Sequence, residues 1–287
     1  MCASMCGQRI FADSFKLFLK MVFELGNLYF NRIYIIQSLR HGDKRTGDEL
    51  LNDIILRRIR NETAEIRDIA TKTELYNYLS HIKNNINQGN LPFIHFETHG
   101  YKDGIELSDG SDVSWKELVP YLREINIQAK NNLFVSMAAC KGGNIQFGVK
   151  VTEPCPFRGF IGPMEDVGEF DLLSSYNEFF DVLLQENDFE KAIDALNATA
   201  KGVKYHHMNT ESFFDVVIKY NEGLEKNDPT IFNDRVEFLL QTELKRNPLT
   251  LIKFGSIENL RKWIEKFVRE RKPETFETLK KRFCHIN

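Results

Sequence analysis

The chain has 287 residues, 42% of them hydrophobic and 28% charged, and a formal net charge of −3 at pH 7. This composition is ordinary for a globular protein, and the absence of repeats and low-complexity tracts excludes a disordered or fibrous chain. At this length the chain can bury a sizeable core and fits either one large domain or one domain with a smaller appendage, so it can carry an enzyme.

The first element is the apolar stretch FADSFKLFLKMVFELGNLYF, residues 11–30. Lys16, Lys20 and Glu24 interrupt it, so it lacks the roughly 20 uninterrupted apolar residues of a membrane span. It also lacks the cleavage pattern of a signal peptide. Its apolar residues recur at helical spacing, and we expect residues 1–30 to be an amphipathic segment packed on the body, with membrane association as the alternative.

Strands and helices alternate through the next 135 or so residues, judged by their hydrophobic periodicity. Strands are expected at 31–39, 64–71, 91–97, 132–139 and 157–162. Helices are expected at 46–59, at 72–86 with Thr73 opening it, at 115–125, and near Ile145 with Asn144 as its N-cap. Between them, GIELSDGSDVSW predicts a hairpin that turns at Asp109 and Gly110.

The chain from Glu169 almost to its end is expected to be helical. Residues 163–243 hold 18 Asp and Glu against 6 Lys and Arg, whereas residues 244–287 hold 12 Lys and Arg against 5 Glu. Either the two helical regions pair with each other and with water, or the basic part recruits an acidic partner. The basic run resembles no nucleic-acid-binding module, so no direct contact with nucleic acid is expected.

The alternation of strands with helices predicts an α/β fold with a mostly parallel sheet, helices on both faces and a helical C-terminal extension. The apolar runs of 91–97 and 132–139 suit central strands covered on both sides. In such sheets the functional cleft lies beyond the carboxyl ends of the strands. His99 and Cys140 both stand at such ends.

The cysteines form an odd set without a CxxC pair, and no secretory signal precedes them. This usage indicates a reducing compartment, the cytoplasm, with thiols rather than disulfides. A thiol in such a protein can be a nucleophile. The five are Cys2, Cys6, Cys140, Cys155 and Cys284.

The stretch LPFIHFETHG, residues 91–100, allows three interpretations of its two histidines. They can be satisfied polar residues at a strand end. They can bind a metal, but on a strand His95 and His99 would stand roughly 13 Å apart, too far to share one ion. They can also supply the base of a cysteine nucleophile, because an imidazole that takes the thiol proton activates the sulfur.

Cys140 is the favoured nucleophile under the third interpretation. Glycines follow both His99 and Cys140, which leaves backbone N–H groups accessible to a substrate carbonyl. Cys155, between two prolines, is the rival thiol, but no histidine-bearing strand end faces it.

These residues carry a resemblance to a known family. FIHFETHG resembles the His-x-x-x-His-Gly box of the CHAT peptidases, which belong to the caspase-like clan of cysteine peptidases, and LFVSMAACKGG is similar to the clan's second box. The resemblance covers roughly residues 30–165. It implies a caspase-like catalytic core at 31–165, completed or flanked by a helical region at 166–287.

The resemblance also implies a mechanism, with His99 as the base, Cys140 as the nucleophile, and Gly100 with the Cys140 N–H lining the oxyanion hole. It implies no cofactor and no metal. It suggests an endopeptidase that cleaves a protein partner, with prokaryotic relatives in defence or regulated-death systems, some of which cut a gasdermin-like pore former. His95 is then expected to be a supporting or packing residue, and the C-terminal helices are expected to be an addition that binds an activating protein or the substrate.

A basic residue, Arg or Lys, is expected on the acyl side of the cut. Carboxylates near the nucleophile can pair with a guanidinium in two parallel hydrogen bonds, whereas acids at a helix start can also act only as caps. Arg158 is the contrary indication, since it could serve a pocket for aspartate. The candidate substrate-binding residues are Glu97, Glu165, Asp166 and Glu169, with Asp171 beside them.

Two further functions compete with the peptidase. A catalytically silent caspase-like binding module would use the fold as a scaffold. The presence of both His99 and Cys140 argues against it, because an inactive protein does not need both residues. A metal-dependent hydrolase is disfavoured by the strand geometry. Glu97 and Lys141 depart from the residues common in CHAT boxes, which leaves substrate preference open.

Overall fold

The computed structural model describes residues 30–59, 63–200, 202–227, 229–246, 249–270 and 273–284. The helix expected at 11–25 lies outside the described residues, as do Cys2 and Cys6.

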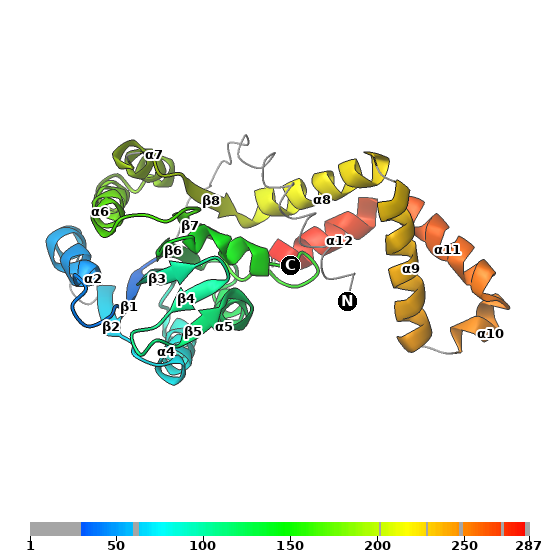
Figure 1. Ribbon diagram of the computed structural model, residues 1–287, viewed down its shortest axis with the longest axis horizontal. Helices are drawn as coiled ribbons and strands as arrows, with labels where there is room; N and C mark the ends of the chain where they lie inside the picture. The colour runs from blue at the N-terminus through cyan, green and yellow to red at the C-terminus, as the bar shows by residue number, and fades with distance from the viewer. Residues whose placement is uncertain are drawn as a thin grey trace.

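The described part of the chain contains one mostly parallel sheet with the strand order β2-β1-β3-β6-β7-β8 (Figure 1). All neighbouring pairs are parallel except β7 and β8, which are antiparallel. A hairpin of β4 and β5 extends from the end of β3. The strands are β1 (Arg32–Ser38), β2 (Ala64–Asp68), β3 (Pro92–Tyr101), β4 (Gly104–Glu106), β5 (Asp112–Ser114), β6 (Phe134–Ala138), β7 (Gly159–Pro163) and β8 (Tyr205–Asn209).

Helices cover both faces of this sheet, which confirms the α/β class and the flanked, mostly parallel sheet. One face carries α4 (Lys72–Asn85), continued by the 3-10 turn η3 (Ile86–Gln88), and α5 (Trp115–Gln128). The other carries α2 (Thr46–Glu49), the π-helical turn η1 (Leu50–Ile55), α3 (Leu56–Arg58), α6 (Glu169–Glu186) and α7 (Phe189–Thr199).

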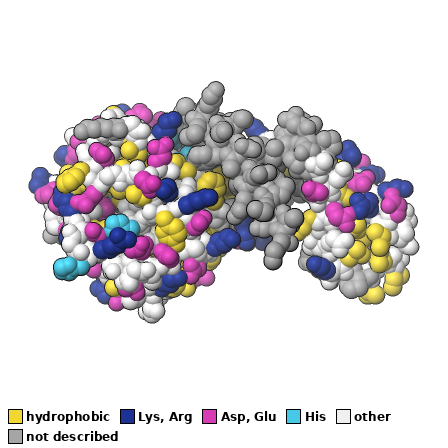
Figure 2. Space-filling model, viewed as in Figure 1, with side chains coloured by type: hydrophobic (Ala, Val, Ile, Leu, Met, Phe, Trp, Pro, Cys, Tyr) yellow, Lys and Arg dark blue, Asp and Glu magenta, His cyan; other side chains and the backbone are white. Residues whose placement is uncertain are grey.

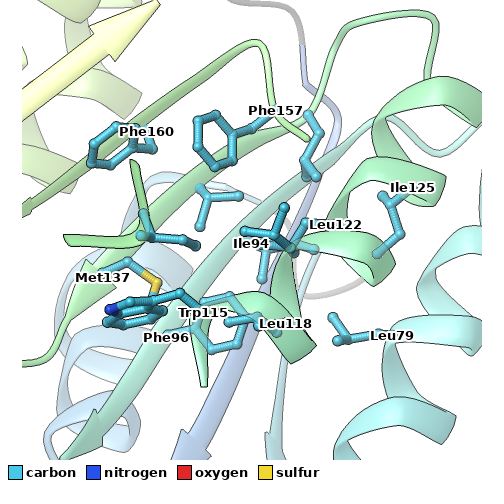
Figure 3. Close-up of a cluster of buried hydrophobic side chains, with 14 of the residues drawn as sticks. Leu79, Ile94, Phe96, Trp115, Leu118, Leu122, Ile125, Met137, Phe157 and Phe160 are labelled. Carbon is cyan, nitrogen blue, oxygen red and sulfur yellow. The ribbon is translucent and has the colours of Figure 1, made fainter. Parts of the chain in front are cut away.

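The central strands are apolar on both faces because each face meets helices. Along β3, Ile94 and Phe96 belong to the core under α4 and α5, and Phe93 belongs to the core under α6. Figure 3 shows the first of these cores, where Leu118 and Leu122 of α5 lie beside β3 residues and Met137 of β6. Burial of side chains of this size stabilises the fold by roughly 1.5–3 kcal/mol each.

The N-terminus of α4 begins at a different threonine from the one predicted. Thr71 is the N-cap, and its side chain accepts a hydrogen bond from the Glu74 N–H while Glu74 bonds back to Thr71. Thr73 lies inside the helix because only Thr71 has a glutamate three residues later. The hairpin was predicted correctly, with Gly110 at φ +83° in its turn.

The short helix after β6 also begins earlier than predicted. It is the 3-10 helix η4 (Gly142–Gly148), and Lys141 occupies the N-cap position. Asn144 is therefore not the cap, and its side-chain amide donates to the Lys102 carbonyl instead, at 3.1 Å.

The expectation that the chain is helical from Glu169 almost to its end was wrong at β8. This strand pairs with β7 from Gly159↔Asn209 to Pro163↔Tyr205 and adds the last strand of the sheet. Its sequence, YHHMN, has neither an apolar run nor a regular alternation, so periodicity did not reveal it.

The remaining C-terminal helices form an arm that extends from the α/β body (Figure 1). α8 (Thr210–Asn227) leads out of the body, and α12 (Pro273–Cys284) runs beside it and back. Between them lie α9 (Pro229–Arg246), α10 (Thr250–Phe254) and α11 (Ile257–Arg269), which share a small core of their own. Among the described helices, none is both long and apolar enough to cross a membrane.

The acidic and basic regions meet through ion pairs, of which two lie among the described side chains. Lys280 of α12 forms an ion pair with Asp215 of α8 at 2.8 Å, and Arg261 of α11 pairs with Glu237 of α9. These pairs fit the expectation that the two regions neutralise each other in part.

Candidate active site

The two sequence boxes meet at the carboxyl ends of β3 and β6. The strands pair in parallel up to Glu97↔Ala138, and His99 and Cys140 each follow the last paired residue of their strand by two positions. Gly100 lies against the backbone of Cys140, because a Cβ built on Gly100 would be 2.2 Å from the Cys140 carbonyl oxygen and 3.1 Å from its nitrogen. Any side chain at this position would push the two strand ends apart, so the close approach requires glycine.

His99 is held by a carboxylate that the sequence analysis missed. Its Nε2 lies 2.8 Å from Asp43 Oδ2, and the same oxygen accepts the Arg40 N–H at 2.7 Å. The hydrogen bond from His99, with a smaller contribution from Arg40, keeps the pKa of the Asp43 carboxyl below its ordinary value. Asp43 follows β1, the neighbour of β3, so its place beyond the carboxyl end of a strand was the available signal.

The loop that carries Asp43 is fixed to the hairpin after β3. Arg40 donates two hydrogen bonds to Glu106 Oε1, at 2.8 and 2.6 Å, and Glu106 is the β4 residue that pairs with His99. The orientation of the His99 ring therefore depends on contacts from both sides of β3.

Cys140 lies directly after β6 and is partly exposed. The backbone N–H of Val167 points to its sulfur at 3.3 Å, so the loop after β7 packs over the thiol. The next residue, Lys141, adopts the left-handed conformation with φ +56°, which costs energy for a residue with a long side chain and is common at functional sites. Lys141 is secured from both ends, by its N–H to the Glu165 carbonyl at 3.0 Å and by its Nζ to Asp166 at 2.7 Å.

His95 and Glu97 belong to a polar chain beneath the site. His95 Nδ1 lies 2.6 Å from Ser136 Oγ, its Nε2 lies 2.9 Å from Glu97 Oε1, and Thr46 donates to the other Glu97 oxygen at 2.7 Å. All four residues are buried, so Ser136 is inaccessible to a substrate although its contacts resemble those of a serine triad. The expected supporting role of His95 fits this position.

The other predicted acids lie on the loop after β7 and at the start of α6. Glu165, Asp166 and Glu169 are exposed, and Asp166 is the one that pairs with Lys141. Glu169 is in the first turn of α6, where negative charge is favourable at a helix N-terminus. Figure 2 shows acidic, basic and histidine side chains intermingled on the visible face of the α/β body.

The alternative nucleophile, Cys155, and the basic residue Arg158 lie at the other end of the strands from Cys140. Cys155 and Arg158 immediately precede β7, at the amino end of the strand, whereas Cys140 follows the carboxyl end of the parallel strand β6. Burial raises the pKa of the Cys155 thiol to about 12, which leaves it almost wholly protonated near neutral pH. Arg158 donates a hydrogen bond to Asn132 at 3.2 Å. Both residues lie at the amino ends of their strands, whereas Cys140 lies at the carboxyl end of β6.

No family model matches the chain, and no curated protein matches its sequence. An imidazole fixed by a carboxylate and a partly exposed thiol, on two strand ends that approach each other through the glycine backbone of Gly100, are groups that can perform nucleophilic acyl transfer. Within the described residues, no group of three or more His, Cys, Asp or Glu is arranged to hold a metal ion.

Proposed function

We propose that the protein is a cysteine endopeptidase of the CHAT or caspase-like type, in which His99 and Cys140 form the catalytic dyad. The observation that carries this proposal is the contact of Gly100 with the Cys140 backbone, because it brings the histidine strand end to the thiol. The mostly parallel sheet with an antiparallel strand at one edge is compatible with a caspase-like fold. The two sequence boxes supply the rest of the support.

In the proposed reaction each group of the site has its own role. Because Nε2 of His99 faces Asp43, Nδ1 is the ring nitrogen that would take the proton of Cys140. The thiolate attacks the scissile carbonyl, and the backbone around Gly100 and Cys140 stabilises the oxyanion. The proton then passes to the leaving amine, and water hydrolyses the acyl-enzyme.

The substrate in this proposal is a protein, and the compartment is the cytoplasm. The arm of C-terminal helices offers surface for an activating protein. A role in prokaryotic defence or regulated cell death, on a gasdermin-like or other effector substrate, belongs to the same proposal and derives only from the resemblance.

Replacement of either dyad member tests the proposal. Cys140→Ala and His99→Ala should each lower turnover on the order of 10⁴-fold while circular dichroism stays unchanged, because the two residues act as a unit. The substrate can be found by incubating wild-type protein with a proteome and mapping new termini, with Cys140→Ala as the matched blank. Cleavage that survives Cys140→Ala but disappears in Cys155→Ala would refute the dyad, and termini identical to those of the blank would favour a silent binding module.

Iodoacetamide labelling gives an independent check. Near pH 8 the native protein should be alkylated at Cys140 long before Cys155 and Cys284, since the pKa of each of these two thiols is raised by burial to about 12. Peptide mass spectrometry reads each site separately. Equal labelling rates at the three sites would contradict the assignment.

Specificity for Arg or Lys on the acyl side of the cut is the second part of the proposal. Asp166 already pairs with Lys141, so an incoming guanidinium would replace that ammonium and gain a bidentate contact. In a fluorogenic peptide panel that varies only this position, Arg should exceed Asp, and Asp166→Asn should reduce the preference roughly tenfold, as expected for a lost charged hydrogen bond of about 1.5 kcal/mol. Glu178→Gln, at an exposed position on α6, serves as the control, and a preference for Asp would overturn the acidic pocket.

A further inference from the structure

The outer end of the arm exposes a set of large apolar side chains. They come from the connection before α10, from α10 itself and from α11, and each is between 48% and 79% exposed. Figure 2 shows hydrophobic side chains gathered at this end of the molecule. We call this set the tip surface: Leu249, Ile252, Ile257, Trp263 and Phe267.

These side chains are not a displaced part of the arm's core. On α11 the core-facing residues are Leu260, Ile264 and Val268, which pack with α9. Trp263 and Phe267 stand one position before Ile264 and Val268, so they form a second stripe beside the buried one. Their rings stack on each other at 5.6 Å, which holds the stripe in place without covering it.

Basic side chains lie among the residues of the tip surface. Lys253, Lys262 and Lys266 are exposed there, and the described residues 249–270 contain five Lys and Arg against three Glu. Lys262 pairs with Glu258 and Lys266 with Glu270, each with 3.8 Å between Nζ and Oε1. Ion pairs this long and solvent-exposed are weak, so they hold these ammonium groups only loosely.

We propose that the tip surface binds the surface of an anionic lipid bilayer. Three features select a bilayer over a protein. The helices that carry the tip surface, α10 and α11, lie at the outer end of the projecting arm (Figure 1), and a lipid surface can accept apolar side chains there without a matching groove. Trp favours the membrane–water interface, Phe suits the apolar face of a helix that lies in that interface, and lysines beside them can keep their ammonium groups at the level of the headgroups. The excess of basic residues complements anionic lipid rather than neutral lipid.

Vesicle co-sedimentation of the full chain tests the proposal. The protein should pellet with vesicles of 70% phosphatidylcholine and 30% phosphatidylglycerol, and roughly 100-fold or more weakly with pure phosphatidylcholine at equal lipid concentration, because each charge near an anionic surface is worth about fivefold. The chain contains two tryptophans, and Trp115 is already buried. A blue shift of emission on lipid addition should therefore report Trp263 and be absent in Trp263→Phe.

Matched variants separate the apolar and charged contributions. Leu249→Ser with Ile252→Ser should weaken binding at least tenfold, whereas Phe238→Ala should leave it unchanged. Phe238 is also exposed, but it lies on α9 two residues from the core-facing Val236 and Leu240 and so points away from α11. The triple change Lys253→Gln, Lys262→Gln and Lys266→Gln should weaken binding roughly 100-fold. The same net charge change at exposed Lys116, Lys130 and Lys150 of the α/β body should have little effect.

Several outcomes would overturn the proposal. No pelleting with anionic vesicles at low salt would do so, as would equal losses in the two lysine triples. Concentration-dependent dimers that disappear in the Leu249→Ser, Ile252→Ser variant would assign the tip surface to a second copy of the chain. Tighter binding to an acidic amphipathic peptide than to vesicles, with loss in the same variant, would assign it to a protein.

Discussion

Asp43 gives His99 a fixed orientation at the edge of the sheet. The contact joins residues 56 positions apart in the chain, and the carboxylate also accepts the Arg40 N–H. A carboxylate so placed holds the imidazole ring and its tautomer, which leaves the opposite ring nitrogen for the thiol.

Asp43→Asn should lower kcat by roughly 10- to 100-fold with little change in KM, because partners of this kind orient a reacting group without touching substrate. The fold should be unaffected, since the carboxylate is partly exposed. Asp53→Asn, an exposed aspartate paired only along the helix with Arg57, is the matched control. An unchanged kcat in Asp43→Asn would show that the contact has no role in turnover.

Asp43 should also affect how the stability of the folded protein depends on pH in the acid range. The pKa of Asp43 is lowered in the folded protein, so the stability that its carboxylate contributes is present above its ordinary range and is lost as the pH falls through the lowered value. Asp43→Asn should remove this contribution.

The proposed catalytic pair could be selected from the sequence because each residue stands at the end of a predicted strand, with Gly100 directly after His99 and Gly142 two residues after Cys140. Asp43 could not be selected, because Asp48, Asp53 and Asp43 all follow the same strand and only the path of the loop decides which one reaches His99. The role of Glu97 could not be predicted either. Strand spacing shows that Glu97 shares a face of β3 with His95, but it does not show that Thr46 donates a hydrogen bond to the Glu97 carboxylate.

Helix α5, like α4, begins with a reciprocal N-terminal cap. Ser114 accepts the Glu117 N–H, and Glu117 accepts the Ser114 N–H and hydroxyl at 2.9 and 2.7 Å and the Lys72 ammonium at 2.9 Å. These hydrogen bonds lower the pKa of Glu117 to about 2. The Glu117 carboxylate therefore holds the N-terminus of α5, which directly follows the hairpin of β4 and β5.

Glu117 should make the protein sensitive to acid. Its folded pKa lies below the unfolded value, so the stability it contributes is complete above about pH 4.5 and is lost as the pH falls towards 2. Urea melts between pH 5 and pH 3 should show a smaller decrease in the free energy of unfolding for Glu117→Gln than for wild type. Glu124→Gln, at an exposed position further along α5, is the comparison, and parallel pH dependences in all three proteins would contradict the cap.

Most elements could be read from periodicity, and the failures have physical causes. Two threonines compete to begin α4, and the reciprocal bond with Glu74 decides between them. The helix at 46–59 was predicted as one helix, but its middle, Leu50–Ile55, widens into a π-helical turn. Strand β8 is defined by its pairing with β7 rather than by its own residues, which include two histidines.

At the scale of the whole molecule, the arm is anchored by the end of α12. Phe283 is fully buried, packs against Phe213 and Phe214 of α8 at 6.1 and 5.6 Å, and its carbonyl accepts the Cys155 N–H at 2.9 Å. The C-terminal helix therefore belongs to the core of the α/β body.

Phe283→Ala should lower the free energy of unfolding by about 3–5 kcal/mol, the usual range for a buried phenylalanine whose removal leaves a cavity. Phe238→Ala removes the same side chain from an exposed position and should change it by less than about 0.5 kcal/mol. Equal effects of the two changes in chemical denaturation would show that α12 is not docked as described.

The return of α12 beside α8 has a consequence for the covalent continuity of the chain. Because both ends of the arm are rooted in the body, a single cut in the peptide chain between α9 and α11 would produce two fragments that stay associated. The nicked protein would migrate as two bands in a denaturing gel and as one species in gel filtration, and its sheet and active-site edge would remain intact.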